Sequence, residues 1–110
     1  MLLPANATIP EEKLTKYLLV LLPKDDKSKF LQKAGYTLEN WQRLEADLRS
    51  QVLTQPAEFW KETSYGKKYL INATLKGVNG LEIEIITIWI LANQQVKFVT
   101  LIPKRRNNRE

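Results

Sequence analysis

The residues from Tyr65 to Tyr69 form the densest group of side chains suited to binding or chemistry. The segment reads YGKKY, so two tyrosines and two lysines, Lys67 and Lys68, lie at the start of a predicted strand. Lysines and aromatic rings in this arrangement suit a phosphate backbone and a stacked base. The alternative is a strand that begins with Tyr69 buried and its lysines solvated. The sequence leaves both alternatives open.

Thr87 and Thr100 are the polar interruptions of two otherwise apolar predicted strands. Threonine favours strands through packing alone, so a structural role is one alternative and a hydroxyl that orients a ligand is the other. If the two strands pair, we expect the hydroxyls to lie near one another in the sheet and to need hydrogen-bond partners.

The chain has neither cysteine nor histidine. This excludes a disulfide framework, a thiolate zinc site and a cysteine nucleophile. It also removes the usual side chain for proton transfer near neutral pH. Glu11 and Glu12 are neighbours that do not face each other on a helix, and for Glu82 and Glu84 a solubilising role is expected. We therefore expect no metal site and no cofactor.

The net charge is +5 at pH 7, and much of it lies in the tail, at Lys104, Arg105, Arg106 and Arg109. The tail is either a solvated terminus or an arm that contacts phosphates. No apolar run reaches the 18 or more residues of a membrane span. The opening residues lack the basic region and apolar core of a signal peptide. We expect a cytoplasmic protein that does not engage a membrane.

The elements that must position these groups predict a single α+β domain over residues 1–110, with helical part 8–53, connector 54–66, β-meander 67–103 and basic tail 104–110. Thr8 to Glu11 reads as a capping box for a helix that runs to about Leu22, where Pro23 stops it. Its apolar face is expected to carry Leu14, Tyr17, Leu18, Leu21 and Leu22. A short helix over 28–34 follows, and Gly35 fits a left-handed residue at its end.

Thr37 is expected to cap a helix over 38–52. One apolar stripe of this helix carries Trp41, Leu44, Leu48 and Val52, and the opposite side carries Arg43, Asp47 and Arg49.

Strands are predicted over 67–76, 81–91 and 95–103, joined by an Asn-Gly turn and a second tight turn. The middle strand is apolar on both faces from Ile86 onward, which is typical of a central strand under a helix or at a protein contact. Phe59 and Trp60 in the connector either pin it to the core or provide a stacking surface. The expected fold has N-terminal helices packed on a C-terminal antiparallel meander of three or four strands.

The YGKKY segment and the segments Thr87–Ile90 and Val99–Pro103 resemble a family of small bacterial domains of unknown function that is common in cyanobacteria. Its members read approximately YG-x-KY, TVWI and VTAYP, and the resemblance covers nearly the whole chain. The layout and ending are also distantly similar to the barnase–EndoU–colicin–RelE group of ribonuclease toxins. The positions that match are Lys27, Lys68, Thr87, Trp89 and Thr100. Asp26 replaces a frequent histidine and Leu101-Ile102 replaces Ala-Tyr, which removes candidate catalytic groups.

The resemblance implies a toxin-like RNA-binding domain, with a metal-independent endoribonuclease of a toxin–antitoxin pair as its enzymatic form. The candidate catalytic residues are Lys68, Tyr65, Thr87 and Thr100, and the candidate RNA-binding residues are Lys27, Lys29, Lys67, Lys104 and Arg105. The alternative is a non-enzymatic protein-interaction module, antitoxin-like or accessory, that uses a sheet edge or an apolar face. Its partner would be a small protein such as an antitoxin, or a second copy in a homodimer. A purely accessory protein without a site is the third hypothesis.

Overall fold

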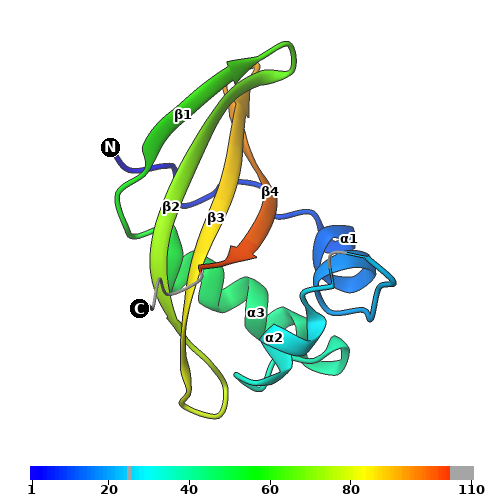
Figure 1. The fold of residues 1–110 in the computed structure, drawn as a ribbon. Coiled ribbons are helices and arrows are strands. Elements are labelled where there is room, and N and C mark those ends of the chain that lie inside the picture. The colour runs from blue at the N-terminus through cyan, green and yellow to red at the C-terminus, as the bar shows by residue number, and fades with distance from the viewer. Residues whose placement is uncertain (25, 105–110) are drawn as a thin grey trace, which may run out of the picture.

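Helices at the start of the chain cover one face of a four-stranded antiparallel sheet, as the computed structural model shows for residues 1–24 and 26–104 (Figure 1). The sheet is a meander in the order β1-β2-β3-β4. This confirms the expected α+β architecture. The elements are α1 (Glu11–Lys13), η1 (Leu14–Leu18), α2 (Ser28–Gln32), η2 (Leu38–Asn40), α3 (Trp41–Asp47), η3 (Leu48–Val52), β1 (Glu58–Thr63), β2 (Gly66–Lys76), β3 (Glu82–Ala92) and β4 (Gln95–Pro103).

The predicted connector 54–66 contains a strand, β1, which the sequence analysis missed. β1 pairs with β2, and a bulge between Phe59 and Lys61 interrupts the pairing at Trp60. The Phe59 ring meets the Tyr69 ring edge to face, with 5.8 Å between centroids. Charged residues flank Phe59 and Trp60 on both sides. The segment therefore lacks the regular alternation of apolar and polar residues by which a strand is recognised in a sequence.

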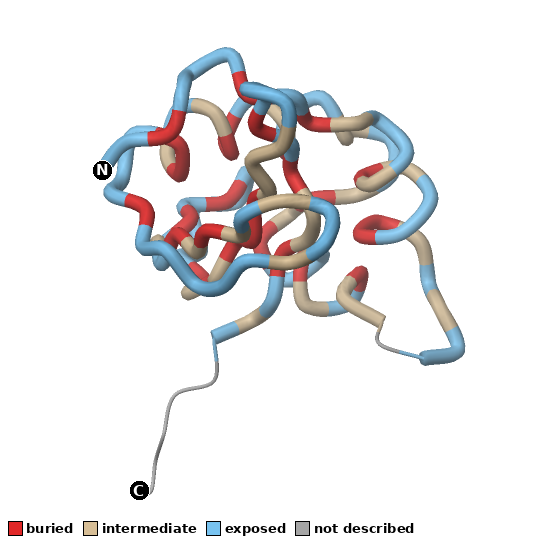
Figure 2. The backbone as a smooth tube through the Cα atoms, turned by 90° about the horizontal axis from the view of Figure 1, so that it is seen from above, coloured by how far each residue is buried: buried red, intermediate tan, exposed pale blue. Residues whose placement is uncertain are grey.

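One face of the sheet carries the core. Tyr69, Ile71 and Leu75 of β2 face the helices, and Trp89 of β3 packs edge to face on Phe98 of β4 with 5.2 Å between ring centroids. Figure 2 shows the buried stretches on the inside of the molecule and the exposed stretches on its outer loops. The expectation that β3 is covered on both faces from Ile86 onward is wrong, because on the face away from the helices only Ile88 is buried. Ile86 and Ile90 are half-buried because the helices lie on the other face.

The first helix begins and ends differently from the prediction. Thr8 is not a helix cap, because its backbone N–H donates to Val96 (2.8 Å) and its carbonyl accepts from Phe98 (2.8 Å), so residues before Pro10 extend along β4. The helix ends at Leu18 rather than near residue 22. Its last turn is a π turn, closed by Leu19 N–H on Leu14 O (3.0 Å).

The π turn changes which side chains of the first helix face inward. Five residues per hydrogen-bonded turn replace the usual four, and this buries Leu14, Leu18 and Leu19. Tyr17 and Leu21, which a regular period placed on the apolar face, are 56% and 67% exposed. Tyr17 therefore stands on the surface, where it is available to a ligand.

The predicted cap of the third helix is confirmed: Thr37 and Asn40 form a capping box before α3. Leu44, Leu48 and Val52 form its buried stripe, as expected. Asp47 was expected on the polar side and is instead buried, with an exposed fraction of 7%.

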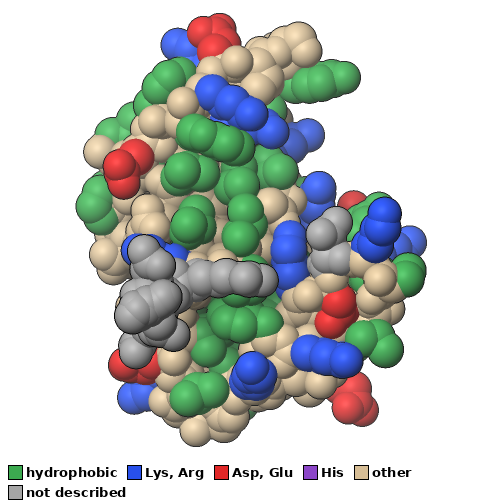
Figure 3. Space-filling model, viewed as in Figure 1, with side chains coloured by type: hydrophobic (Ala, Val, Ile, Leu, Met, Phe, Trp, Pro, Cys, Tyr) green, Lys and Arg blue, Asp and Glu red, His purple; other side chains and the backbone are tan. Residues whose placement is uncertain are grey.

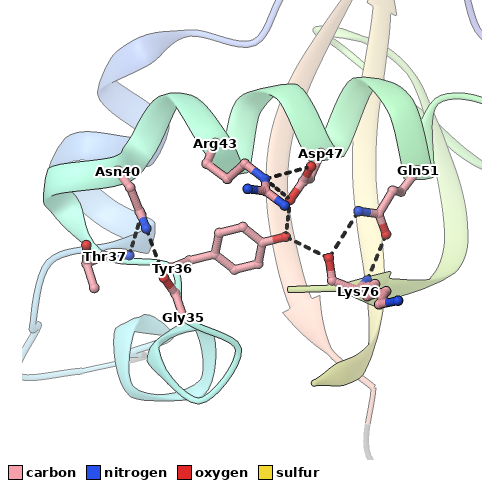
Figure 4. A network of polar contacts seen from close by, with 8 residues as sticks. All are labelled: Gly35, Tyr36, Thr37, Asn40, Arg43, Asp47, Gln51 and Lys76. Atoms are coloured by element: carbon pink, nitrogen blue, oxygen red, sulfur yellow. Dashed lines mark hydrogen bonds and ion pairs between the residues drawn. The ribbon is translucent and has the colours of Figure 1, made fainter. Parts of the chain in front are cut away.

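A buried hydrogen bond joins α3 to the loop before it and to the end of β2 (Figure 4). The Tyr36 hydroxyl donates to Asp47 Oδ2 at 2.6 Å and lies 3.2 Å from the carbonyl oxygen of Lys76. Arg43 Nε also reaches Asp47, at 3.1 Å. Gln51 completes the link through its side-chain amide, which donates to Lys76 O (3.1 Å) and accepts from Lys76 N–H (2.7 Å). Burial and the neighbouring Asp47 raise the pKa of Tyr36 well above its ordinary value, so the phenol stays a donor.

The β2–β3 hairpin packs directly on the end of α2. A Cβ added at Gly77 would meet the carbonyl oxygen of Ala34 at 2.1 Å, so only glycine fits there. The Asn79 amide donates to Lys33 O at 2.8 Å across the same contact. Gly35 has a φ of +89° where α2 ends, which confirms the expected left-handed residue at this helix end.

Asp26 organises the loop before α2. Its carboxylate accepts hydrogen bonds from Leu22 N–H (3.0 Å), Ser28 Oγ (2.8 Å) and Lys29 N–H (3.4 Å). These hydrogen bonds hold the pKa of Asp26 below its ordinary value of 3.8, and the bond from Leu22 N–H has the largest effect. Asp26 therefore holds the loop that contains Lys27.

Replacing Tyr36 by Phe should lower the free energy of unfolding by about 1–3 kcal/mol, because a buried carboxylate loses a hydrogen-bond donor. Urea denaturation followed by circular dichroism measures this loss. The matched control is Tyr65→Phe, the same change on a side chain that is 82% exposed, and it should stay within about 0.5 kcal/mol of wild type. Equal stability of the two variants would contradict a role for the buried bond.

The carboxyl carbon of Asp26 should titrate below pH 3.8 when followed by NMR. Because the folded pKa is the lower one, these bonds contribute stability above that pH, and the contribution is lost as the pH falls through the lowered pKa. Ser28→Ala removes one donor and should raise the pKa of Asp26, whereas Ser64→Ala, in an exposed turn, should leave it unchanged. An Asp26 pKa at or above its ordinary value would show that the hydrogen bonds do not hold the loop.

Candidate nucleic-acid interface

The sheet face opposite the helices, called the open face below, carries apolar side chains between lysines. In Figure 1 it is turned toward the viewer, with α3 behind it. The strand registers place its side chains in three rows across β2, β3 and β4: Lys68, Ile90 and Lys97; then Leu70, Ile88 and Thr100; then Asn72, Ile86 and Ile102. Ile102 is 38% exposed, and Leu70, Ile86 and Ile90 are half-buried.

Aromatic and basic side chains gather at one end of the open face, in a group we call the strand-end cluster: Trp60, Lys61, Tyr65, Lys68 and Lys97. The Nζ atoms of Lys61 and Lys68 lie 4.2 Å and 5.9 Å from the centroid of the Trp60 ring. Tyr65, in the turn between β1 and β2, lines a hollow of about 250 Å³ together with Ile90 and Lys97. The bulge in β1 brings Trp60 beside Lys68.

A second bulge decides where Thr100 points. Ile88 of β3 pairs with Thr100, but the next residue, Trp89, pairs with Phe98, so Val99 is the extra residue of β4. A bulge re-aims the side chains that follow it. Thr100 therefore lies on the open face while Phe98 and Leu101 both face the core.

Lys27 and Thr100, both predicted site residues, are in direct contact. Lys27 Nζ donates to Thr100 Oγ1 at 3.0 Å across 73 positions of sequence. They border a pocket of about 340 Å³ between η1, the loop before α2 and β4, called the lysine pocket below. It is lined by Lys13, Tyr17, Leu18, Leu22, Lys24, Lys27, Val99 and Thr100.

The neighbours Lys67 and Lys68 point to opposite faces of the sheet. Lys68 pairs with Ile90 on the open face, whereas Lys67 pairs with Leu91 and projects on the helix side. Side chains alternate along a strand, so one ligand on the open face reaches only Lys68. Tyr69 faces the core with an exposed fraction of 9%, as the structural alternative for this segment expected.

Thr87 is fully buried on the core side of β3. Its hydroxyl accepts a hydrogen bond from Trp89 Nε1 (2.7 Å) and lies 3.4 Å from Ile71 O. It sits opposite Leu101, so the expected closeness to the Thr100 hydroxyl is wrong: the bulge turns the two threonines to opposite faces. Thr87 orients a core tryptophan, and no ligand on the surface reaches it.

Other predicted binding residues lie apart from these groups. Lys29 is exposed on α2. Lys104 directly follows β4, far from the strand-end cluster, and its N–H donates to Glu84 O of β3 at 2.9 Å. Arg105, Arg106 and Arg109 lie outside the described residues.

Five basic or aromatic side chains of these two groups were not predicted as site residues from the sequence: Lys13, Tyr17, Lys24, Lys61 and Lys97. Strand alternation with Thr100 would have given the wrong face for Lys97, because the bulge breaks the alternation. No sequence signal brings residues 13, 17 and 24 to β4, since their position depends on the π turn and on the loop held by Asp26.

The chemistry of the two groups is that of anion binding. Lysine ammonium groups lie beside aromatic rings and a hydroxyl, and among the residues that the structure describes no carboxylate lines the lysine pocket. Figure 3 shows Lys and Arg side chains at the end of the open face that carries the strand-end cluster and again beside β4, with hydrophobic side chains between them. Within residues 1–24 and 26–104, no group of acidic side chains is arranged to hold a metal ion. No helix in the same part of the chain is long and apolar enough to cross a membrane.

Comparisons with known proteins yield one match. No curated protein and no solved structure matched this chain. Residues 4–105 match a protein family described as a domain of unknown function, DUF6883. The match spans all the described helices and strands. The chain is therefore a member of the DUF6883 family.

Proposed function

We propose that this protein binds single-stranded RNA across the open face of its sheet. The observation that carries the proposal is the strand-end cluster, where two exposed aromatic rings stand among three lysines. Trp60 and Tyr65 are 44% and 82% exposed. Exposed rings on a sheet stack on bases with little sequence preference, and nearby lysines hold the backbone phosphates.

The lysines of the strand-end cluster have charge available for a ligand. Among the described residues, one ion pair joins Arg43 to Asp47 within α3, and another joins Arg49 of η3 to Glu45 of α3. Lys61, Lys68 and Lys97 therefore have no acidic partner within that part of the chain. Their binding to phosphates would release counterions, which favours a polyanion at low salt.

Cleavage of RNA stays a prediction. Of the four candidate catalytic residues, Lys68 and Tyr65 belong to the strand-end cluster, Thr100 borders the lysine pocket, and Thr87 is buried. We infer that RNA binding is the primary activity. Incubation of labelled RNA with wild type and with Lys68→Ala, read on a denaturing gel, tests whether cleavage accompanies it.

Lys68→Ala should weaken binding of a labelled RNA 12-mer about two- to fivefold at low salt, as expected for one lost surface ion pair. The matched control is Lys67→Ala, which removes the same charge from the neighbouring position on the other face of the sheet. Fluorescence anisotropy at several salt concentrations measures both. The negative slope of log K against log salt should become less steep by about 0.7 for Lys68→Ala, as expected when one phosphate contact is lost. The slope should not change for Lys67→Ala.

Equal effects of the two lysine substitutions would mean that binding follows net charge and does not use the open face. Absence of RNA affinity in wild type at low salt would end the proposal. A DNA 12-mer of the same sequence shows whether the 2′-hydroxyl contributes.

The half-buried apolar rows of the open face favour a second candidate function, a protein-interaction module. Leu70, Ile86 and Ile102 form an apolar patch away from the strand-end cluster. Exposed apolar patches rimmed by polar residues are typical of protein contacts. The occupant would be a small partner protein or a second copy of the chain.

If a second copy occupies this patch, the apparent mass in sedimentation should rise with concentration, and Ile86→Lys should abolish that rise. Leu21→Lys introduces the same charge at an exposed leucine on the helical side and serves as the control. A wild-type mass that stays monomeric at all concentrations would rule out self-association through the open face.

A further inference from the structure

The lysine pocket is a separate concavity from the strand-end cluster, built by parts of the chain that are far apart in sequence. η1 contributes Tyr17 and Leu18, the loop before α2 contributes Leu22 and Lys24, and β4 contributes Thr100. Leu18 is buried in the core. The pocket therefore has one wall fixed by core packing and another fixed by the sheet.

The charged side chains that line this pocket, among residues 1–24 and 26–104, are all lysines: Lys13, Lys24 and Lys27. Neither Lys13 nor Lys24 forms an ion pair within the described residues. The nearby carboxylate of Asp26 accepts hydrogen bonds from Leu22 N–H and Ser28 within its own loop. Lysine is a compact point charge with three donors, which suits a phosphate group.

The size and walls of the pocket require more than a phosphate. Its volume of about 340 Å³ lies at the lower end of the range of small-molecule sites, roughly 300–1,000 Å³. A phosphate group alone would leave most of it unfilled. Leu22 and Val99 offer apolar contacts, and the exposed Tyr17 ring, with Lys13 Nζ at 5.9 Å from its centroid, offers a surface for an aromatic base.

We propose that the lysine pocket binds one phosphorylated nucleotide, with its phosphate on Lys13 and Lys24 and its base against Tyr17. The nucleotide is either free or the phosphorylated end of an RNA strand. The strand-end form rests on the RNA-binding function proposed above, whereas the free form does not. Thr100, held by Lys27, closes the pocket on the side of the open face.

The first experiment titrates isotope-labelled protein with uridine 5′-monophosphate, uridine and inorganic phosphate, and follows amide NMR shifts. The monophosphate should shift residues of η1, the loop before α2 and β4, and should bind about tenfold more tightly than uridine, because an ionised phosphate makes charge-assisted hydrogen bonds that uridine cannot make. Tyr17→Leu should weaken the monophosphate and leave inorganic phosphate unaffected. A monophosphate that binds no more tightly than uridine, or that shifts only the strand-end cluster, overturns the proposal.

The second experiment compares two double variants of equal charge. Lys13→Ala with Lys24→Ala should raise the Kd of the monophosphate about tenfold or more, because both phosphate contacts are lost. Lys16→Ala with Lys33→Ala removes two exposed lysines that do not line the pocket, and should leave the Kd within about twofold, since neither makes a direct contact with the phosphate and exposed charges are screened by salt. Equal Kd values for the two double variants overturn the proposal even if wild type binds the monophosphate.

RNA 12-mers with a 5′-phosphate, a 3′-phosphate or neither separate the two sources of the nucleotide. Tighter binding of a phosphorylated end, lost in Lys13→Ala with Lys24→Ala, assigns the pocket to strand ends. Equal binding of all three RNAs, with monophosphate binding still weakened in that double variant, assigns the pocket to free nucleotides.

The double variant Lys61→Ala with Lys68→Ala distinguishes the two proposals. Loss of RNA binding there with the monophosphate retained supports both sites, whereas monophosphate binding by a wild type without RNA affinity ends only the RNA proposal.

Discussion

The buried hydrogen bond between the Tyr36 hydroxyl and Asp47 is the contact on which the arrangement of the helices depends. It is short, at 2.6 Å, and lies in the interior where α3, the loop before it and the end of β2 meet. A carboxylate there is stable only with its donors in place, because water cannot replace them. The bond therefore sets the position of α3 on the sheet. η1 packs on α3 in turn, and η1 forms one wall of the lysine pocket. The hydrogen bond in the core thus affects the shape of the lysine pocket through the packing of η1 on α3.

The coverage of the sheet on a single face shapes everything proposed for function. Helices bury the side of the sheet that carries Trp89 and Phe98, and the other side keeps Ile86 and Ile90 half-buried beside lysines. A sheet with one open face has two kinds of surface available, an apolar floor and a charged rim. The floor suits protein contacts, while the rim and the strand-end cluster suit a polyanion. The two proposed functions accordingly use neighbouring parts of the same face.

Two irregularities position side chains of the lysine pocket, and both break a simple period. The π turn of η1 turns Tyr17 outward while Leu18 and Leu19 go inward. The bulge at Val99 turns Thr100 to the open face, away from Thr87. Irregular turns and bulges often occur at functional sites because they aim a side chain in a direction that a regular element does not allow. The lysine pocket has one such irregularity in each of two walls.

The local features of the sequence were enough to predict the α+β class, the helix cap at Thr37, the left-handed Gly35 and the Asn-Gly hairpin, because each depends on residues a few positions apart. They also marked Tyr65, Lys68 and Thr100, because polar residues at the start of a strand or within an apolar strand can be recognised from the sequence, whereas Lys27 was marked only by the family resemblance. Only the tertiary structure decided that Thr8 joins β4, that Trp60 lies in a strand, and that Lys67 and Lys68 serve different faces. It alone joined Lys27 to Thr100 and placed Lys13 and Tyr17 with them. The reason is that burial and long-range pairing select among local alternatives of nearly equal free energy. A shift of one residue in a strand or helix turn then reverses which side chains meet.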